Sequence, residues 1–137
     1  MTAQSVTPRV TRYGEIAEVL RDQSVAAITT SSEGGWVVPA YGRILEVFCS
    51  SGTAGSGGTS DIIDVLLNGT TIFTTQGNRP TLLVGDTGTF TLSGLGASIA
   101  QPEVIIVKPG DILRWVCEQQ CTTGSALFKI AIPIGRR

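Results

Sequence analysis

The chain has 137 residues, the size of one domain and enough to bury a hydrophobic core without a metal or disulfides. It has 10 basic and 11 acidic residues and a net charge of −1, so no basic face for nucleic acid is expected. Only 15% of the residues are charged and 42% are hydrophobic. This balance favours a chain whose surface is partly covered in an oligomer or larger assembly.

The chain contains no histidine. This absence excludes Ser-His-Asp and Cys-His catalysis and most zinc chemistry, which depend on an imidazole. The N-terminus lacks the basic start and apolar core of a signal peptide, and no run reaches the ~20 apolar residues that span a membrane. No convergent set of titratable groups is visible either. We therefore expect cytoplasmic synthesis, no membrane partner, no enzymatic activity, no cofactor and no metal.

Residues 1–40 differ from the rest of the chain and are predicted to form an N-terminal arm. The arm begins as an extended segment and contains the only plausible helix, at residues 12–27. Ile16, Val19 and Leu20 stand at positions i, i+3 and i+4 of this segment, which gives a short apolar stripe. Because so short a helix is marginal by itself, we expect it to pack against a partner.

From residue 41 to residue 137 the apolar pattern has a period of two, and six to eight short strands separated by turns are expected. This pattern predicts an all-β fold, namely an antiparallel β-sandwich of the jelly-roll-like kind. The clearest element is a hairpin between residues 61–67 and 70–75. Its turn is Asn68-Gly69, and both residues tolerate the positive φ that a type I′ turn requires.

The remaining elements are weaker. Strands are expected at residues 43–49, 81–84, 90–92 and 103–107. Loops are expected at residues 50–60 and 94–102, and a turn at 108–111. Residues 112–118 and 125–133 are predicted to pair as a second hairpin. The last run alternates most cleanly, with one face formed by Ala126, Phe128, Ile130, Ile132 and Ile134.

Three cysteines, an odd number, give no disulfide framework. Cys117 and Cys121 are separated by three residues, but a structural zinc site usually needs four ligands and Cys49 is the only other sulfur ligand. In an oxidising setting Cys49 can pair with either of the other two. In a reducing compartment we expect Cys49 and Cys117 to be buried as small hydrophobic residues and Cys121 to be an exposed loop thiol.

Asp61 and Asp64 resemble a pair of carboxylates that act as acid and base or bind calcium. An odd step along a strand places them on opposite faces, so we expect solvated or edge-blunting carboxylates. The glycine-rich run 52–58 lacks the Gly-Lys-Ser/Thr ending of a phosphate loop and is not followed by a helix. It is interpreted as a mobile loop.

Three aromatic residues are candidates for a sugar-binding or partner-binding surface. Trp115 alternates with apolar neighbours and is expected in the core. Trp36 lies where the arm meets the sandwich and is the better interface candidate, although packing within its own subunit is an equal alternative. Tyr41 follows shortly after it.

The run 65–75, followed by Asn78-Arg-Pro-Thr81, resembles a sequence motif of small bacteriophage virion proteins built on jelly-roll-like sandwiches. Weaker likenesses follow in the same order: residues 42–48 to a first core strand, 51–55 to the small-residue loop after it, and 108–113 to a Gly-Asp turn. The resemblance covers about residues 41–134.

The resemblance implies a structural virion protein. The arm in front of the sandwich suits a capsid decoration (cement) protein, commonly a homotrimer that binds the major capsid protein or other virion subunits. The alternatives are a tail or baseplate adaptor or fibre module and, in another class, a carbohydrate-binding module. The candidate partner interface consists of Val10, Tyr13, Ile16, Val19, Leu20, Trp36 and Tyr41.

Overall fold

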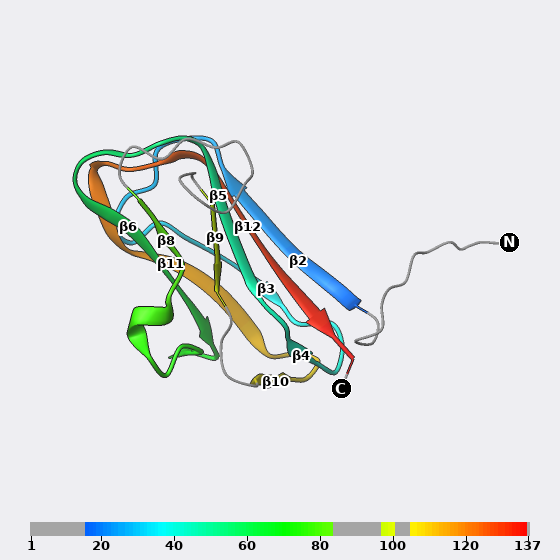
Figure 1. Cartoon of the computed structure of the whole chain (residues 1–137). Coiled ribbons are helices and arrows are strands. Elements are labelled where there is room, and N and C mark those ends of the chain that lie inside the picture. The colour runs from blue at the N-terminus through cyan, green and yellow to red at the C-terminus, as the bar shows by residue number, and fades with distance from the viewer. Residues whose placement is uncertain (1–15, 84–96, 101–104, 137) are drawn as a thin grey trace, which may run out of the picture.

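A computed structural model describes residues 16–83, 97–100 and 105–136 of the chain. These residues form two antiparallel sheets packed face to face, so the predicted all-β sandwich is confirmed (Figure 1). We name the sheets after their central strands. The β12 sheet contains β2 (Ile16–Ser24), β4 (Gly42–Ile44), β5 (Val47–Thr53), β9 (Ala97–Ala100), β10 (Ile105–Val107) and β12 (Ala126–Gly135). The β11 sheet contains β3 (Glu33–Val37), β6 (Ser56–Leu67), β7 (Thr70–Thr71), β8 (Thr81–Leu82) and β11 (Ile112–Thr123).

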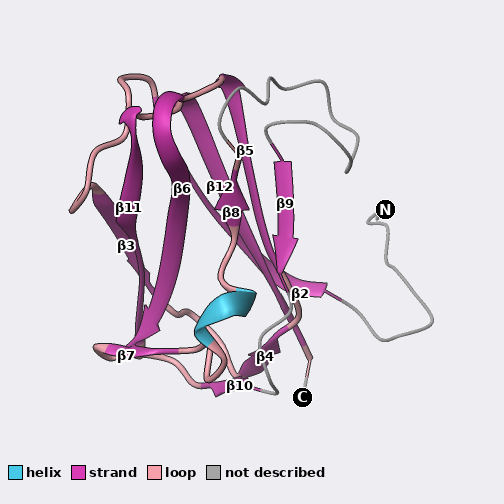
Figure 2. Cartoon of the chain, turned by 60° about the vertical axis from the view of Figure 1, so that its left-hand side comes forward, coloured by secondary structure: helices cyan, strands magenta, loops and turns pink. Residues whose placement is uncertain are grey.

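The described strands pair in a nested order. β2 lies along one side of β12, while β4 and β5 follow one another along its other side, with β10 and β9 beyond them. In the second layer, β3 and β6 flank β11, and β7 and β8 lie beyond β6. Figure 2 shows β3, β11 and β6 in one layer and β2, β12, β5 and β9 in the other. The first strands of the chain thus pair with the last ones, and strands nearer the middle of the chain pair with one another. This is the order of a jelly roll.

Inward-facing side chains of the two central strands fill the space between the sheets. The predicted alternation at the end of the chain is confirmed, because Phe128, Ile130, Ile132 and Ile134 are all buried. β11 alternates in the same way, with Leu113, Trp115 and Cys117 inward. Trp115 meets Phe128 with ring centroids 4.8 Å apart, so an aromatic pair joins the two layers. Burial of each large apolar side chain contributes about 1.5–3 kcal/mol.

The predicted hairpin is confirmed at its turn. Asn68 and Gly69 have φ values of 51° and 89°, and β6 pairs with β7 directly across them. The second strand is shorter than predicted and ends at Thr71. The Ile72 N–H still donates to the Val65 carbonyl of β6 (2.9 Å). The Phe73 N–H then donates to Thr71 Oγ1 (3.1 Å), and the chain turns away into the 3₁₀ helix η1 (Gln76–Asn78).

The predicted helix at residues 12–27 is wrong over the residues that the structure describes. Residues 16–24 form β2, which pairs antiparallel with β12 from Phe128 to Gly135. Leu20 points into the core and Val19 to the opposite face, so the apolar residues that suggested a helical stripe do not share a face. Pairing with a distant strand overrides the weak helical preference.

The boundary of the arm at residue 40 is also wrong. β3 pairs with β11 along its full length, so residues 16–24 and 33–37 are both strands of the sandwich. Of the predicted arm, only residues 1–15 precede the first described strand.

The segment 50–60 is not a loop, because β5 runs to Thr53 and β6 begins at Ser56. Gly57 and Gly58 have φ values of 72° and 69°, and a Cβ on either would press against Thr122 of β11. The small residues therefore let two irregular strands approach closely. The predicted loop 94–102 contains β9, and the predicted strand 90–92 lies outside the described residues.

The second predicted hairpin is wrong. β11 continues to Thr123, and the chain then crosses at Gly124-Ser125 into the other sheet, so β11 and β12 never pair. Gly124 is required at this crossover, because a Cβ there would overlap the carbonyl oxygen of Ile28. Ile28 is fully buried, and its N–H donates to the Ser125 carbonyl (2.9 Å). The crossover is thus packed against the segment between β2 and β3.

The placement of β2 in the sandwich is tested by Leu20→Ala. Leu20 is 6% exposed, so we expect a loss of about 2–5 kcal/mol in the free energy of unfolding, measured by urea denaturation. Gln23→Ala, on the exposed face of the same strand, is the matched control and should change stability by less than about 0.5 kcal/mol. A Leu20→Ala protein as stable as the control would contradict this position for β2.

Candidate functional site

The first candidate pair of carboxylates is buried, so the expectation of solvated or edge-blunting groups is wrong. Asp61 is fully buried in β6. Its Oδ1 accepts from the Cys121 N–H (2.8 Å), and its Oδ2 accepts from the Ser125 N–H (3.0 Å) and the Ser125 hydroxyl. All of these donors lie at the end of β11 or in the crossover to β12. Asp61 therefore serves as an internal clamp, with its acceptor positions occupied by the protein itself.

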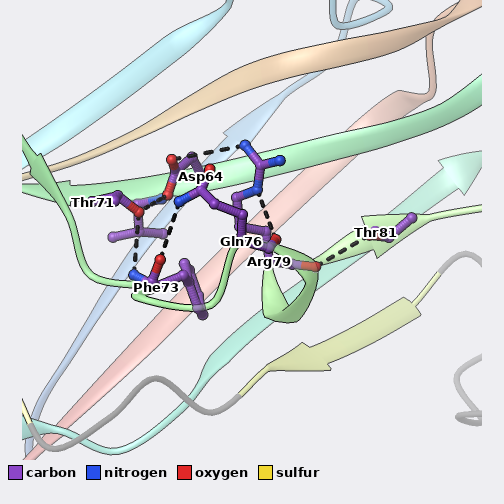
Figure 3. A network of polar contacts seen from close by, with 7 residues as sticks. Asp64, Thr71, Phe73, Gln76, Arg79 and Thr81 are labelled. Atoms are coloured by element: carbon purple, nitrogen blue, oxygen red, sulfur yellow. Dashed lines mark hydrogen bonds and ion pairs between the residues drawn. The ribbon is translucent and has the colours of Figure 1, made fainter.

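Asp64 points to the outer side of β6 but is only 4% exposed (Figure 3). Its Oδ1 accepts from the Val65 N–H (2.8 Å) and the Thr71 hydroxyl (2.5 Å). The Arg79 guanidinium lies 4.0 Å from its other oxygen, and Arg79 Nε donates to the Gln76 carbonyl (2.9 Å). These contacts hold the segment that runs from β7 through η1 to β8 against β6. The two aspartates thus serve different parts of the fold.

A third carboxylate, Asp111, was not singled out from the sequence. It accepts from Lys108 Nζ (2.8 Å) and from Asn68 Nδ2 (3.1 Å), while Asn68 Oδ1 accepts from the Ile112 N–H (2.8 Å). The hydrogen bond from Lys108 is the main cause that lowers the pKa of Asp111 from 3.8 to about 2, and the same contact raises the pKa of Lys108. The side chain of Asn68 thus ties the hairpin turn to the 108–111 turn.

Two tryptophans join β2 to the β11 sheet. Trp115 is in the core, as predicted, and its Nε1–H donates to Asp22 Oδ2 (2.8 Å). Trp36 is half-buried, and its Nε1–H donates to the Arg21 carbonyl (3.0 Å), so it packs within its own subunit. Gly34 makes room for this contact, since a Cβ there would overlap Asp22 Oδ2 and lie 2.6 Å from Trp115 Nε1.

All three cysteines are buried free thiols. The prediction holds for Cys49 and Cys117, but the exposed position predicted for Cys121 is wrong. Burial raises the pKa of Cys117 to about 12 and raises the pKa values of Cys49 and Cys121 as well. Thiols of this kind are inert at neutral pH, because the thiolate is the reactive form.

The predicted interface residues are scattered. Val10 and Tyr13 lie outside the described residues, and Ile16 lies in β2. Leu20 is buried, so its assignment to a partner interface is wrong. Val19 and Trp36 are half-buried, and Tyr41 is 61% exposed. Val37, which ends β3, and Ile112, which begins β11, are exposed cross-strand neighbours.

Over residues 16–83, 97–100 and 105–136, no group of three potential metal-ligating residues comes together. Within the same residues, no helix is long and apolar enough to cross a membrane. No protein-family model matches the chain, and no curated protein matches it either.

The glycine at position 34 provides a test of the tryptophan contacts. We expect Gly34→Ala to lower the free energy of unfolding by about 1–3 kcal/mol, because the new methyl group displaces Asp22 from Trp115. Tryptophan fluorescence and urea denaturation report both effects. Gly77→Ala is the control, since a Cβ at position 77 meets nothing within 4 Å. Equal stabilities of the two variants would show that a methyl group at position 34 does not disturb the Asp22–Trp115 hydrogen bond.

The Asp111 cluster predicts an acid-dependent loss of stability. Because the folded-state pKa of Asp111 (about 2) lies below the ordinary 3.8, its contribution is present above about pH 4 and is lost as the pH falls toward 2. Asp111→Asn should be less stable at pH 6 and should lose less stability between pH 4 and 2, as measured by urea unfolding. Lys108→Met should flatten the same pH profile, because it removes the main cause of the shift. Profiles parallel to the wild type would contradict the assignment.

Proposed function

We propose that the protein is a structural component of a bacteriophage particle, and specifically a capsid decoration protein that binds the head shell as a homo-oligomer. The observation that carries this proposal is a jelly roll in which each buried carboxylate of the described residues bonds to its own chain. Jelly rolls are frequent in viral capsid proteins. A fold whose buried polar groups bond within their own chain suits a structural role in an assembly. The low share of charged residues favours the same role.

The alternatives gain less support. A tail or baseplate module has the same requirements for fold and surface, and only its location on the particle differs. Carbohydrate binding is known for lectin jelly rolls and needs exposed aromatic faces. Of the three aromatic residues considered as candidates, Trp115 is in the core and Trp36 is half-buried with its N–H occupied, which leaves Tyr41 as the exposed one. Catalysis is disfavoured, because the described buried carboxylates and the thiols are held in structural contacts or in the core.

Location on the particle tests the proposal directly. We expect immunogold electron microscopy of purified particles to place the protein on heads, and sedimentation of the free protein to show a trimer. Labelling of tails would favour the adaptor alternative. Absence from both heads and tails would overturn a virion role.

A truncation tests the arm, which is now limited to residues 1–15 because β2 belongs to the sandwich. Deletion of residues 2–15 should leave the β-rich circular dichroism spectrum and cooperative unfolding intact and abolish binding to shells. Deletion of residues 2–40 removes two strands and should unfold the domain, so it cannot serve as the test. Full occupancy of shells by the 2–15 deletion would refute a docking role for the arm.

A further inference from the structure

The outer face of the β12 sheet has an apolar centre. The cross-strand register places Val19, Phe48, Ala131 and Pro133 on this face, because their strand neighbours point into the core. Leu45 joins them by covering Gly135. Pro133 is buried and the other four are half-buried. Outward positions of a two-layer sandwich are normally polar, so this apolar strip distinguishes the β12 face from an ordinary solvent-facing one.

The charged side chains on the strands of this face are basic. Among the described outward strand positions, the charged residues are Arg21, Arg43 and Lys129, and none of them forms an ion pair within the described part of the chain. One acidic residue, Glu46, lies in the connection between β4 and β5, so basic residues outnumber acidic ones on this side of the sheet. The acidic residues of β2, Glu18 and Asp22, belong to its inward-facing set, opposite Ile134 and Ile130.

The outer face of the β11 sheet differs in this respect. Its cations are matched by carboxylates: Arg114 Nη1 lies 2.8 Å from Glu33, and Arg79 faces Asp64 at 4.0 Å. Unbalanced positive charge around an apolar centre is therefore a property of the β12 face alone among the two described outer faces. A second copy docked face to face would bring cations against cations, which disfavours self-association through this surface.

We propose that the outer face of the β12 sheet docks onto a protein surface with an apolar centre edged by carboxylates; under the proposed function, which this inference extends, that surface belongs to the head shell. Four neighbouring strands about 4.8 Å apart, each about nine residues long, give this face an area of roughly 600 Å². Two such surfaces together reach about 1,200 Å², the lower limit of stable specific interfaces. Attachment of several subunits of one oligomer raises the effective affinity further.

The test uses charge reversals at exposed strand positions. Arg21→Glu and Lys129→Glu change the β12 face, and Arg114→Glu makes the same charge change on the opposite face as the matched control. Thermal unfolding first establishes that all three variants are folded. In sedimentation with purified shells, we expect each β12-face variant to bind about tenfold more weakly and the control to stay within about twofold of the wild type. Equal weakening of all three, or wild-type binding by the β12-face variants, would overturn the inference.

A second probe does not depend on the virion. On a mixed-mode resin that carries phenyl and carboxylate groups, Arg21→Glu and Lys129→Glu should elute at lower salt than Arg114→Glu. Equal elution of the three variants would overturn the inference even if the protein decorates shells. If the resin distinguishes the variants but the wild type is absent from particles, the proposed function fails and the chemistry of this face stands.

Cross-linking identifies the partner. A zero-length carbodiimide reagent should join Lys129 Nζ to an Asp or Glu of another virion protein. Cross-links from Lys129 only to further copies of this chain would replace the proposed partner with a second copy. Co-sedimentation with phosphatidylglycerol vesicles that is lost in Lys129→Glu would instead assign the face to an anionic membrane.

Discussion

The crossover from β11 to β12 is the constraint on which both sheets depend. These two strands are the central strands of opposite layers, and only Gly124 and Ser125 connect them. Asp61 fixes the crossover by accepting from Cys121 and Ser125, so β6 is aligned with β11 by a buried, hydrogen-bonded side chain as well as by its ladder. Removing one partner of a buried hydrogen-bonded group costs about 1–3 kcal/mol. Asp61 thus fixes the connection between β11 and β12, and other strands of the two sheets pair with these central strands.

The buried polar groups also limit what the protein can do. Each described buried carboxylate accepts hydrogen bonds from its own chain: Asp61 at the crossover, Asp64 at the β7–β8 excursion and Asp111 between two turns. A catalytic carboxylate needs a free acceptor position and access to a substrate. These three are committed to connections between strands. The described buried carboxylates thus help to hold the connections between strands in place.

The parts of the fold predicted from the sequence are those set by local patterns. Asn68-Gly69 specifies its own turn, and the alternation in β11 and β12 needs no knowledge of a partner strand. β2 was missed because its apolar spacing fits a helix as well as a strand, and its partner lies more than 100 residues away along the chain. Burial of Cys121 and Asp61 depends on register shifts in β11, which no local pattern specifies.

The same distinction applies to the candidate site. Hydrophobicity selected Leu20 as an interface residue, but only the pairing of β2 with β12 shows that Leu20 faces inward and Val19 outward. The pairing also brings Arg21 beside Ala131, although these two residues are more than 100 positions apart in the sequence. A contact surface on a sheet is a property of register. Since a shift of one residue exchanges the two faces of a strand, the β2–β12 pairing that stabilises the sandwich also determines which side chains the β12 face presents.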